Sequence, residues 1–284
     1  MTASQQKKYI EVKMDTQLEN DIYQKSVDGF ISLDMQMELS KAHKISMFHL
    51  EETMLKLGIT PKRYIKNKNT VSSEKQLKLL QSAVVIIGCG GLGGHVSSQL
   101  ARLGVGKLIL VDPDVYDETN LNRQCFSNIS YQGKSKVGII KKLLKKINPA
   151  VKVVGIKERF SEQNFNFLES ADVVADCLDS INTRKILSKV CSDLRIPLVH
   201  ASIGGFYGQS AICMPGDNII EKIYGCVVED KGIEVIAGNL SFVAAIFASI
   251  QTMLIYKVLT DDKVKSKIIA VSLNEFEVSN FFDL

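Results

Sequence analysis

The chain has 284 residues, with 35 lysines and arginines against 31 aspartates and glutamates and a net charge of +4. This length can bury the core of one large α/β domain, alone or with a small appendage. The content of 45% hydrophobic and 23% charged residues is ordinary for a globular protein. The charge is too small to indicate nucleic-acid binding by itself, so no nucleic-acid partner is predicted.

Cysteine usage and the first residues bear on the compartment. Six cysteines are scattered along the chain, and no two form a CxxC pair. This is typical of small buried hydrophobes in a cytosolic protein and not of a disulfide framework. The opening, MTASQQKKYIEVKMD, lacks the apolar core of a signal peptide. We therefore expect a soluble, cytoplasmic protein.

One apolar stretch, Leu240 to Tyr256, has to be weighed as a membrane span. It is short for a bilayer, and it contains Ser241, Gln251 and Thr252. A buried helix explains it better, so no membrane partner is predicted.

Residues 1–67 differ in composition from the rest of the chain, being rich in Met, Lys and Glu. Two short helices are predicted over 31–45 and 46–59, with Gly58 and Pro61 ending the second. No catalytic constellation lies here. We interpret the segment as a helical N-terminal appendage that packs or docks, with partner recognition as the alternative.

Beyond about residue 71 strand and helix patterns alternate, which predicts a parallel sheet with crossover helices. The predicted strands cover 83–87, 107–111, 151–156, 172–177 and 197–202, and the helices 95–103, 134–147 and 183–194. After Gly204 the rhythm changes to a strand over 209–214 and one or two strands in the tail. The predicted fold is α/β, a Rossmann-like, doubly wound mixed sheet over 68–284 preceded by the appendage.

A glycine-rich turn follows the first predicted strand. Gly88, Gly90 and Gly93 fit the GxGxxG pattern, and a helix pattern begins near His95. Glycines allow a tight turn and let backbone amides approach a phosphate at the helix N-terminus. Asp112, at the end of the next strand, can accept hydrogen bonds from ribose hydroxyls. A nucleotide site is predicted, and both NAD and ATP remain open at this point.

The next segment, DPDVYDETNLNRQ, favours a polyphosphate over a dinucleotide. Asn120, Arg123 and Gln124 follow the second strand and can lie near the glycine turn. The Arg123 guanidinium offers a forked donor to phosphate oxygens, and Lys136 at a helix start adds a second cation. Two cations suit nucleotidyl transfer, where charge builds on the α-phosphate and pyrophosphate, whereas hydride transfer develops no such charge.

The segment DCLDS places two carboxylates at the end of the fourth predicted strand. Asp176 ends the strand and Asp179 lies in the loop beyond it. A carboxylate at this position could hold Mg²⁺ against the phosphates.

Taken in order, GCGGLGG, DPD, NLNRQ, GKSK, INP, DCLD and GGFYGQ resemble the ThiF/MoeB/HesA superfamily, relatives of ubiquitin-activating enzymes. The resemblance runs from about Arg63 to the C-terminus. It implies ATP- and Mg²⁺-dependent adenylation of the C-terminal glycine of a ubiquitin-like protein such as a sulfur carrier, by a homodimer. It implies, too, that GGFYGQ lines the channel for the incoming tail.

The resemblance implies a role for each matched residue. The phosphate loop is formed by Gly88, Gly90, Gly91 and Gly93. Asp112 holds the ribose and Asp179 is the Mg²⁺ ligand. The triphosphate is contacted by Asn120, Arg123, Gln124 and Lys136. Arg123, Lys136 and Asp179 are the residues expected to carry the catalysis.

The sequence departs from the family pattern at several positions. The usual RYxRQ reads Arg63-Tyr64-Ile65-Lys66-Asn67, which loses the fork of an arginine expected to reach a neighbouring protomer, and Ser180 replaces the asparagine of DxxDN. Cys226 stands alone where many members have two CxxC pairs, so no zinc is predicted. Cys226 is also the candidate for a thioester or persulfide step, but Glu229 and Asp230 nearby disfavour a thiolate.

The sequence thus predicts an adenylyltransferase that activates a sulfur-carrier protein ending in Gly-Gly. Three alternatives stay open: the same chemistry on a peptide or a tRNA base, an NAD-dependent oxidoreductase, and a non-catalytic scaffold. The carrier and its pathway are not specified by the sequence, because fold and family do not fix a substrate.

Overall fold

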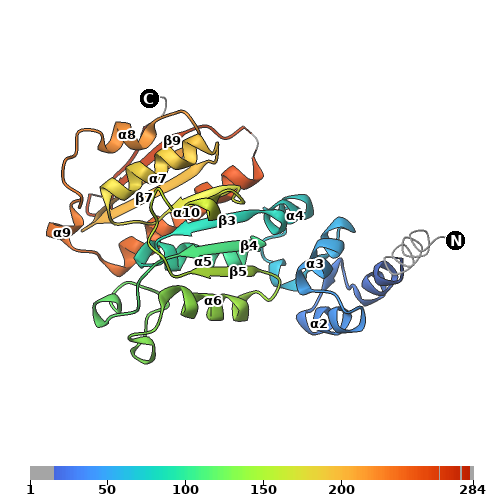
Figure 1. The fold of residues 1–284 in the computed structure, drawn as a ribbon. Helices are drawn as coiled ribbons and strands as arrows, with labels where there is room; N and C mark the ends of the chain where they lie inside the picture. Colours follow the sequence, from blue (N-terminus) through green and yellow to red (C-terminus); the bar gives the residue numbers. More distant parts are fainter. Residues whose placement is uncertain (1–15, 262, 276, 282–284) are drawn as a thin grey trace. The chain divides into compact units, whose positions relative to one another are not determined.

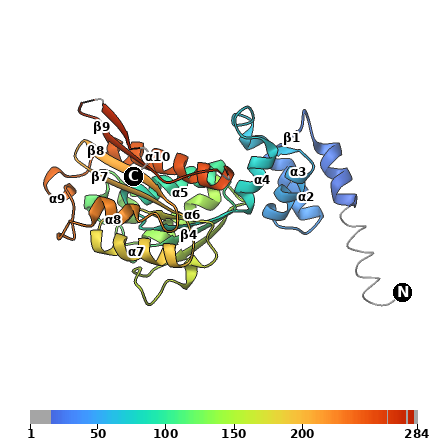
Figure 2. The ribbon, with the colours of Figure 1, turned by 90° about the horizontal axis from the view of Figure 1, so that it is seen from above.

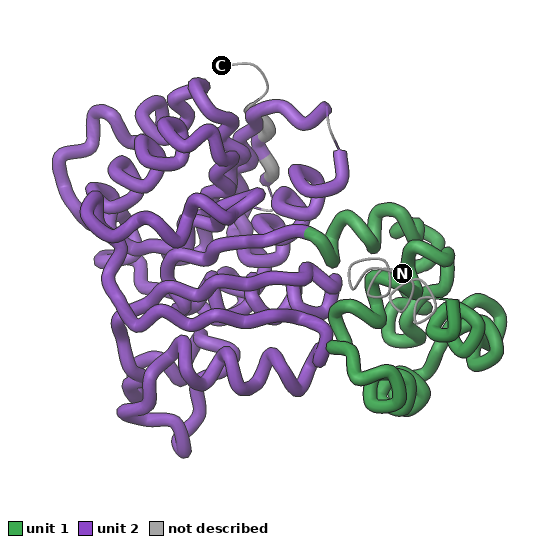
Figure 3. The backbone as a smooth tube through the Cα atoms, turned by 45° about the vertical axis from the view of Figure 1, so that its right-hand side comes forward, with its two compact units in different colours: residues 1–81 green, residues 82–284 purple. Residues whose placement is uncertain are grey.

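The computed structural model describes residues 16–261, 263–275 and 277–281 (Figure 1). The chain forms two compact units, which divide between Gln81 and Ser82 (Figure 3). Each unit has a hydrophobic core of its own. The predicted domain division after residue 67 stays a prediction.

The first unit is helical, and the two helices predicted in it are confirmed. Ser32 and Ser46 cap them, each accepting a hydrogen bond from the backbone N–H three residues on. Two further helices and a short parallel strand pair were not predicted, because their apolar pattern is too short to recognise. The elements are the helical residues 16–25, β1 (Phe30–Ile31), α2 (Leu33–Ala42), α3 (Met47–Lys56), β2 (Thr60–Pro61), η1 (Lys62–Tyr64) and α4 (Ser73–Gln81).

A buried ion pair stands beside the apolar core of this unit. The guanidinium of Arg63 donates to Glu51 Oε2 at 2.8 Å and to Gln36 Oε1 at 2.8 Å. Burial raises the pKa of Glu51, an effect that Arg63 opposes. Arg63 therefore has structural partners within its own unit, while Lys66 is exposed.

The second unit is built on one eight-stranded sheet in the order β10-β9-β8-β7-β6-β3-β4-β5. The five strands from β7 to β5 are parallel, and β8, β9 and β10 continue the sheet antiparallel. The predicted mixed sheet is confirmed. The strands are β3 (Ala83–Ile87), β4 (Lys107–Val111), β5 (Lys152–Ile156), β6 (Val173–Asp176), β7 (Leu198–Gly204), β8 (Tyr207–Cys213), β9 (Lys267–Ser272) and β10 (Glu277–Phe281).

Helices cover both faces of this sheet, as a doubly wound fold requires (Figure 2). On one face α10 packs on α5, which packs on α6, and on the other α7 packs on α8. The helices are α5 (Gly91–Leu103), α6 (Lys136–Ile147), α7 (Ile181–Asp193), α8 (Ile219–Tyr224), α9 (Glu234–Ala237) and α10 (Ser241–Thr260), with 3-10 turns η2 (Glu118–Asn120), η3 (Ile129–Tyr131) and η4 (Asn166–Leu168). Helix α5 begins inside the glycine turn, earlier than the predicted start at His95, because Gly91 already has helical geometry.

Helix α10 is long and apolar enough to cross a membrane by length and composition alone. In the structure it packs across β6, β7 and β8, and half of its most apolar window is buried. Its buried Gln251 donates from Nε2 to the backbone oxygens of Asp176, at 2.9 Å, and Val199, at 2.8 Å. The contacts of α10 are those of a core helix.

We expect Gln251→Leu to lower the free energy of unfolding by about 3 kcal/mol, because two buried carbonyl groups lose their donors. Ser249→Ala, on the exposed side of the same helix, should change it by less than about 0.5 kcal/mol. Urea unfolding followed by circular dichroism measures both. Equal stabilities for the two variants would show that the Gln251 hydrogen bonds do not hold α10 on the sheet.

Candidate active site

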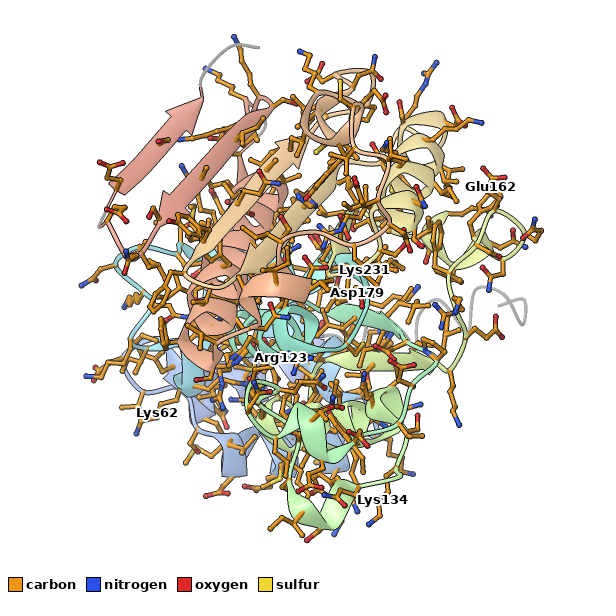
Figure 4. The ribbon with its side chains drawn as sticks, turned by 90° about the vertical axis from the view of Figure 1, so that its left-hand side faces the viewer. Lys62, Arg123, Lys134, Glu162, Asp179 and Lys231 are labelled. Atoms are coloured by element: carbon orange, nitrogen blue, oxygen red, sulfur yellow. The ribbon has the colours of Figure 1, made fainter. Side chains whose placement is uncertain are left out.

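A cavity of about 800 Å³ opens in the second unit where the parallel strands end. It lies beside β3, which has β4 on one side and β6 on the other, so the chain winds outward in both directions from this point. One wall comes from the glycine turn and the segment after β4, and the other from the ends of β7 and β8. Arg123, Asp179 and Lys231 lie close together around this region (Figure 4).

The glycine turn can form only without side chains at two positions. Gly88 has φ +89, and a Cβ there would lie 2.6 Å from the backbone oxygen of Cys177. A Cβ on Gly93 would lie 1.9 Å from the backbone oxygen of Gly88. Gly90 and Gly91 have room and line the cavity, whereas Gly93 lies behind it. Of the four predicted loop glycines, Gly93 therefore serves packing of the turn and does not face the cavity.

Asp112 lines the cavity and ties the turn to the neighbouring strand. Its Oδ2 accepts a hydrogen bond from Cys89 N at 2.7 Å, and its Oδ1 accepts from Asp114 N at 2.8 Å. The carboxylate is almost fully buried. Each oxygen keeps acceptor capacity, so the predicted contact with a ribose is compatible with this structural role.

The three predicted polar residues after β4 all line the cavity. Asn120 is held by its neighbours, since its Oδ1 accepts from Asp117 N at 3.1 Å. Arg123 donates from Nη1 to the backbone oxygen of Thr119 and leaves its second terminal nitrogen for a ligand. Gln124 is buried, and its Oε1 has no hydrogen-bond partner among the described residues. An unpaired buried acceptor is costly and indicates a ligand or water at this wall.

Lys136, the first residue of α6, brings a second cation to the cavity. Its Nζ lies 3.0 Å from Asp114 Oδ2, with the Lys136 side chain 8% exposed and that of Asp114 57% exposed. The stem is thus fixed by packing, while the acidic partner can turn toward solvent.

Asp179 follows β6 at the mouth of the cavity, with 78% of its side chain exposed. Its Oδ2 accepts from Lys231 Nζ at 2.5 Å. Lys231 was missed by sequence reasoning, because nothing in the VVEDKG loop marks it. Its position is set by Asp230, whose Oδ1 accepts from Ser180 Oγ at 2.6 Å and Asn182 N at 3.0 Å.

Behind this wall lies a wholly buried ionic cluster. His200 Nδ1 lies 2.7 Å from Asp176 Oδ2, and Arg184 Nη1 lies 3.7 Å from the same oxygen. Burial alone would raise the pKa of Asp176, but Arg184 and the His200 hydrogen bond outweigh it and hold that pKa low. Burial lowers the pKa of His200. His200 is thus a hydrogen-bonded buried histidine, and Asp176 is a charged structural group.

A profile of the ThiF family matches residues 63–282. This match spans most of the chain and includes every residue of the cavity walls described above. The chain belongs to the ThiF family. The sequence resemblance drawn from its motifs is confirmed.

Several members of the ThiF family match about half of the chain. The SAMP-activating enzyme E1 of Haloferax volcanii is 38% identical over 146 residues, which are 51% of this chain and 54% of the relative. The sulfur carrier protein ThiS adenylyltransferase of Escherichia coli K12 is 35% identical over 146 residues, 51% of this chain and 58% of the relative. The chain thus spans less than two thirds of the length of either relative.

Solved structures of a ThiF-like fold match more of the chain. Crystal structures of E. coli MccB superpose with a TM-score of 0.66 for the ATP complex, at 25% identity over 78% of this chain and 71% of that chain. The succinimide complex gives a TM-score of 0.67, at 23% identity over 87% of this chain and 81% of that chain. The predicted Rossmann-like fold is confirmed.

The described residues contain no group of three or more His, Cys, Asp or Glu side chains placed to hold a metal ion. Asp179 is a single exposed carboxylate, which suits a Mg²⁺ ion that takes most of its ligands from phosphates and water. All six cysteines are free, and Cys226 is exposed. The carboxylate of Asp230, which follows Cys226 in the same loop, accepts a hydrogen bond from Asn182 N at the start of α7.

We expect Gly93→Ala to lower the free energy of unfolding by at least about 3 kcal/mol, because its Cβ would collide with a backbone carbonyl that cannot move away. Gly91→Ala should change it by less than about 1 kcal/mol, since helix geometry and ordinary contact distances accommodate the methyl group. Chemical denaturation of the full chain measures both. The tight turn would be refuted by a Gly93→Ala variant as stable as the wild type.

Proposed function

We propose that this chain is an ATP-dependent adenylyltransferase that activates the C-terminal carboxylate of a polypeptide as an acyl-adenylate and releases pyrophosphate. The observation that carries the proposal is a single cavity with two unlike walls in a ThiF-family fold. One wall has the glycine turn and two cations, and the other includes Gly204 at the end of β7 and residues 207–209 at the start of β8.

The nucleotide wall fits ATP on three structural grounds. Gly90 and Gly91 leave the N-terminus of α5 open to a phosphate. The unpaired Gln124 Oε1 supplies a buried acceptor that no described side chain uses. Arg123 and Lys136 provide positive charge beside both. A dinucleotide used for hydride transfer would not need these two cations, so the oxidoreductase alternative is not favoured.

Asp179 is the residue proposed to hold Mg²⁺. A bound Mg²⁺ would neutralise charge on the triphosphate and orient it. Because Lys231 pairs with Asp179 Oδ2, its ammonium group competes with a metal ion for the charge of this carboxylate. Lys231 then remains at the cavity mouth as a third cation.

The residues act by positioning and charge neutralisation. Arg123 and Lys136 would stabilise the charge that develops on the α-phosphate and the leaving pyrophosphate. A C-terminal carboxylate is already ionised near neutral pH, so no general base is required. Holding it beside the α-phosphate converts a bimolecular encounter into an oriented reaction, which is a large part of the rate.

The first candidate acceptor is a ubiquitin-like sulfur carrier with a Gly-Gly C-terminus. It is supported by the relatives, among them the ThiS adenylyltransferase of E. coli. We propose that the reaction takes place in the cytoplasm and that the chain acts as a homodimer, as the family resemblance implies.

A second candidate acceptor is a peptide precursor. The MccB structures cover 78% and 87% of this chain, a larger share than residues 82–284 make up, so their similarity extends into the first unit. One of them is a complex of MccB with N-formylated MccA. An N-formyl group is the mark of a newly translated polypeptide, which favours a peptide over a tRNA base as the alternative substrate.

ATP–pyrophosphate exchange tests the proposed reaction. With Mg²⁺ and the right polypeptide we expect exchange that falls at least about 100-fold in Arg123→Ala and in Asp179→Asn, because each removes charge stabilisation in the transition state. Lys134→Ala, an exposed lysine just before α6, is the matched control and should retain exchange. Carriers ending in Gly-Gly and candidate precursor peptides are assayed side by side.

Exchange with one class of polypeptide identifies the acceptor. ATP binding without exchange, for every carrier and peptide tried, would contradict the proposal and favour a non-catalytic scaffold. Exchange that survives in Arg123→Ala would remove that residue from the mechanism.

Lys231→Gln should strengthen metal binding. The variant lacks the ammonium group that competes for Asp179, and an exposed pair of this kind is worth about 0.2–1 kcal/mol, so Mn²⁺ should bind the ATP complex more tightly, by up to about 5-fold. Electron paramagnetic resonance titration of Mn²⁺ measures this, with Lys134→Gln as the control. Weaker Mn²⁺ binding in Lys231→Gln would show that the lysine supports the metal site and does not compete with it.

A further inference from the structure

The second wall of the cavity carries a chain of hydrogen bonds that the proposed adenylation does not use. Ser202 of β7, Gln209 of β8 and Tyr224 at the end of α8 line the cavity. Behind them lie His200 and Asp176, both fully buried. Tyr224 connects the two groups, since its hydroxyl lies 3.2 Å from His200 Nε2 and 2.9 Å from Gln209 Nε2.

The charge on Asp176 fixes where the protons of His200 lie. Asp176 is ionised beside Arg184, so the ring nitrogen 2.7 Å from its Oδ2 must be the donor, and Nδ1 carries the proton. Burial and the nearby guanidinium oppose a second proton on the ring. His200 is therefore neutral, and its Nε2 can only accept.

The Tyr224 hydroxyl lies 3.2 Å from His200 Nε2, and Arg184 Nη1 is a second donor, 3.4 Å from the same nitrogen. Gln209 Nε2 donates to the Tyr224 oxygen. The Tyr224 hydroxyl in turn donates to Ser202 Oγ at 3.0 Å. Tyr224 therefore links Gln209 and Ser202, which line the cavity, to the buried His200.

The donors and acceptors that Gln209 and Ser202 have left define which ligand groups this wall can recognise. Gln209 retains its Oε1 and one N–H, for which no described partner exists, and Ser202 retains its hydroxyl proton. A primary amide of this kind matches the N–H and C=O of a backbone peptide group. A carboxylate, which only accepts, would leave Gln209 Oε1 without a donor. The wall thus favours the peptide backbone and leaves the terminal carboxylate to the nucleotide side.

We propose that Gln209 and Ser202 form a subsite for the last backbone amide of the acceptor polypeptide, oriented by the Tyr224–His200–Asp176 chain. The inference rests on the proposed function and deepens it. Recognition of a backbone N–H is independent of side chains, so it acts on the tail of a carrier and of a peptide alike. Tyr224 and His200 are positioning residues, since they act through Gln209 and Ser202.

The test uses three unreactive mimics of the acyl-adenylate, titrated calorimetrically into the full chain. The first is 5′-sulfamoyladenosine without a tail. The second carries an acetyl-glycyl-glycyl tail on the sulfamoyl nitrogen, and the third has an ester in place of the amide between the two glycines. The ester lacks the N–H, so the wild type should bind the amide about 5- to 10-fold more tightly, the effect of one neutral hydrogen bond.

Two variants locate the discrimination. Tyr224→Phe removes the hydroxyl that orients Gln209, and Gln209→Met removes the amide itself. In both, the amide and ester mimics should bind within about 2-fold of each other, while the affinity for 5′-sulfamoyladenosine stays at the wild-type value. A purely structural role for Tyr224 would weaken all three mimics together. Tyr256→Phe on α10 is the matched control, and Gln209→Met gives the answer if Tyr224→Phe does not fold.

Two results overturn the subsite and are distinguishable from each other. Equal affinity of the wild type for the amide and ester mimics, or a preference that persists in both variants, overturns the subsite while the nucleotide site stands. Failure of the wild type to bind even 5′-sulfamoyladenosine overturns the proposed function, and the subsite with it.

Discussion

One buried carboxylate, that of Asp176, holds the elements around the cavity in place. It ends β6, pairs with Arg184 of α7 and accepts a hydrogen bond from His200 of β7. Its backbone oxygen receives Gln251 from α10 on the opposite face of the sheet. A charge buried this deeply is stabilising only when its partners are fixed. The elements that form both walls are therefore held in place by this cluster.

The two walls divide the recognition of two substrates between them. The glycine turn and its cations are suited to phosphate charge, whereas the Gln209 wall offers uncharged hydrogen-bond donors and an acceptor. Asp179 and Lys231 stand between the walls as an exposed pair that a metal ion can separate. A polypeptide tail bound along one wall would therefore place its carboxylate toward the other, where the positive charge lies.

The sequence predicted those parts of the fold and of the site that depend on residues adjacent in the chain. Strands β3 and β4 were predicted with their true bounds, because each is an uninterrupted apolar run bounded by polar residues or glycine. The glycine turn and the residues after β4 follow strands directly, which is why they were found. The Tyr224–His200–Asp176 chain and the Lys231–Asp179 pair were not, since they join residues from separate elements that no local pattern connects. The catalytic roles assigned to Arg123, Lys136 and Asp179 stay predictions.

The most direct test of the central claim follows an oxygen atom. A polypeptide that supports pyrophosphate exchange is labelled with ¹⁸O in its C-terminal carboxylate, incubated with ATP and Mg²⁺, and treated with hydroxylamine to release AMP. Attack of that carboxylate on the α-phosphate leaves one of its oxygens in the bridge, so mass spectrometry should find one ¹⁸O in the AMP. Unlabelled AMP, formed together with the polypeptide's hydroxamate, would contradict an acyl-adenylate and with it the account of the cavity given above.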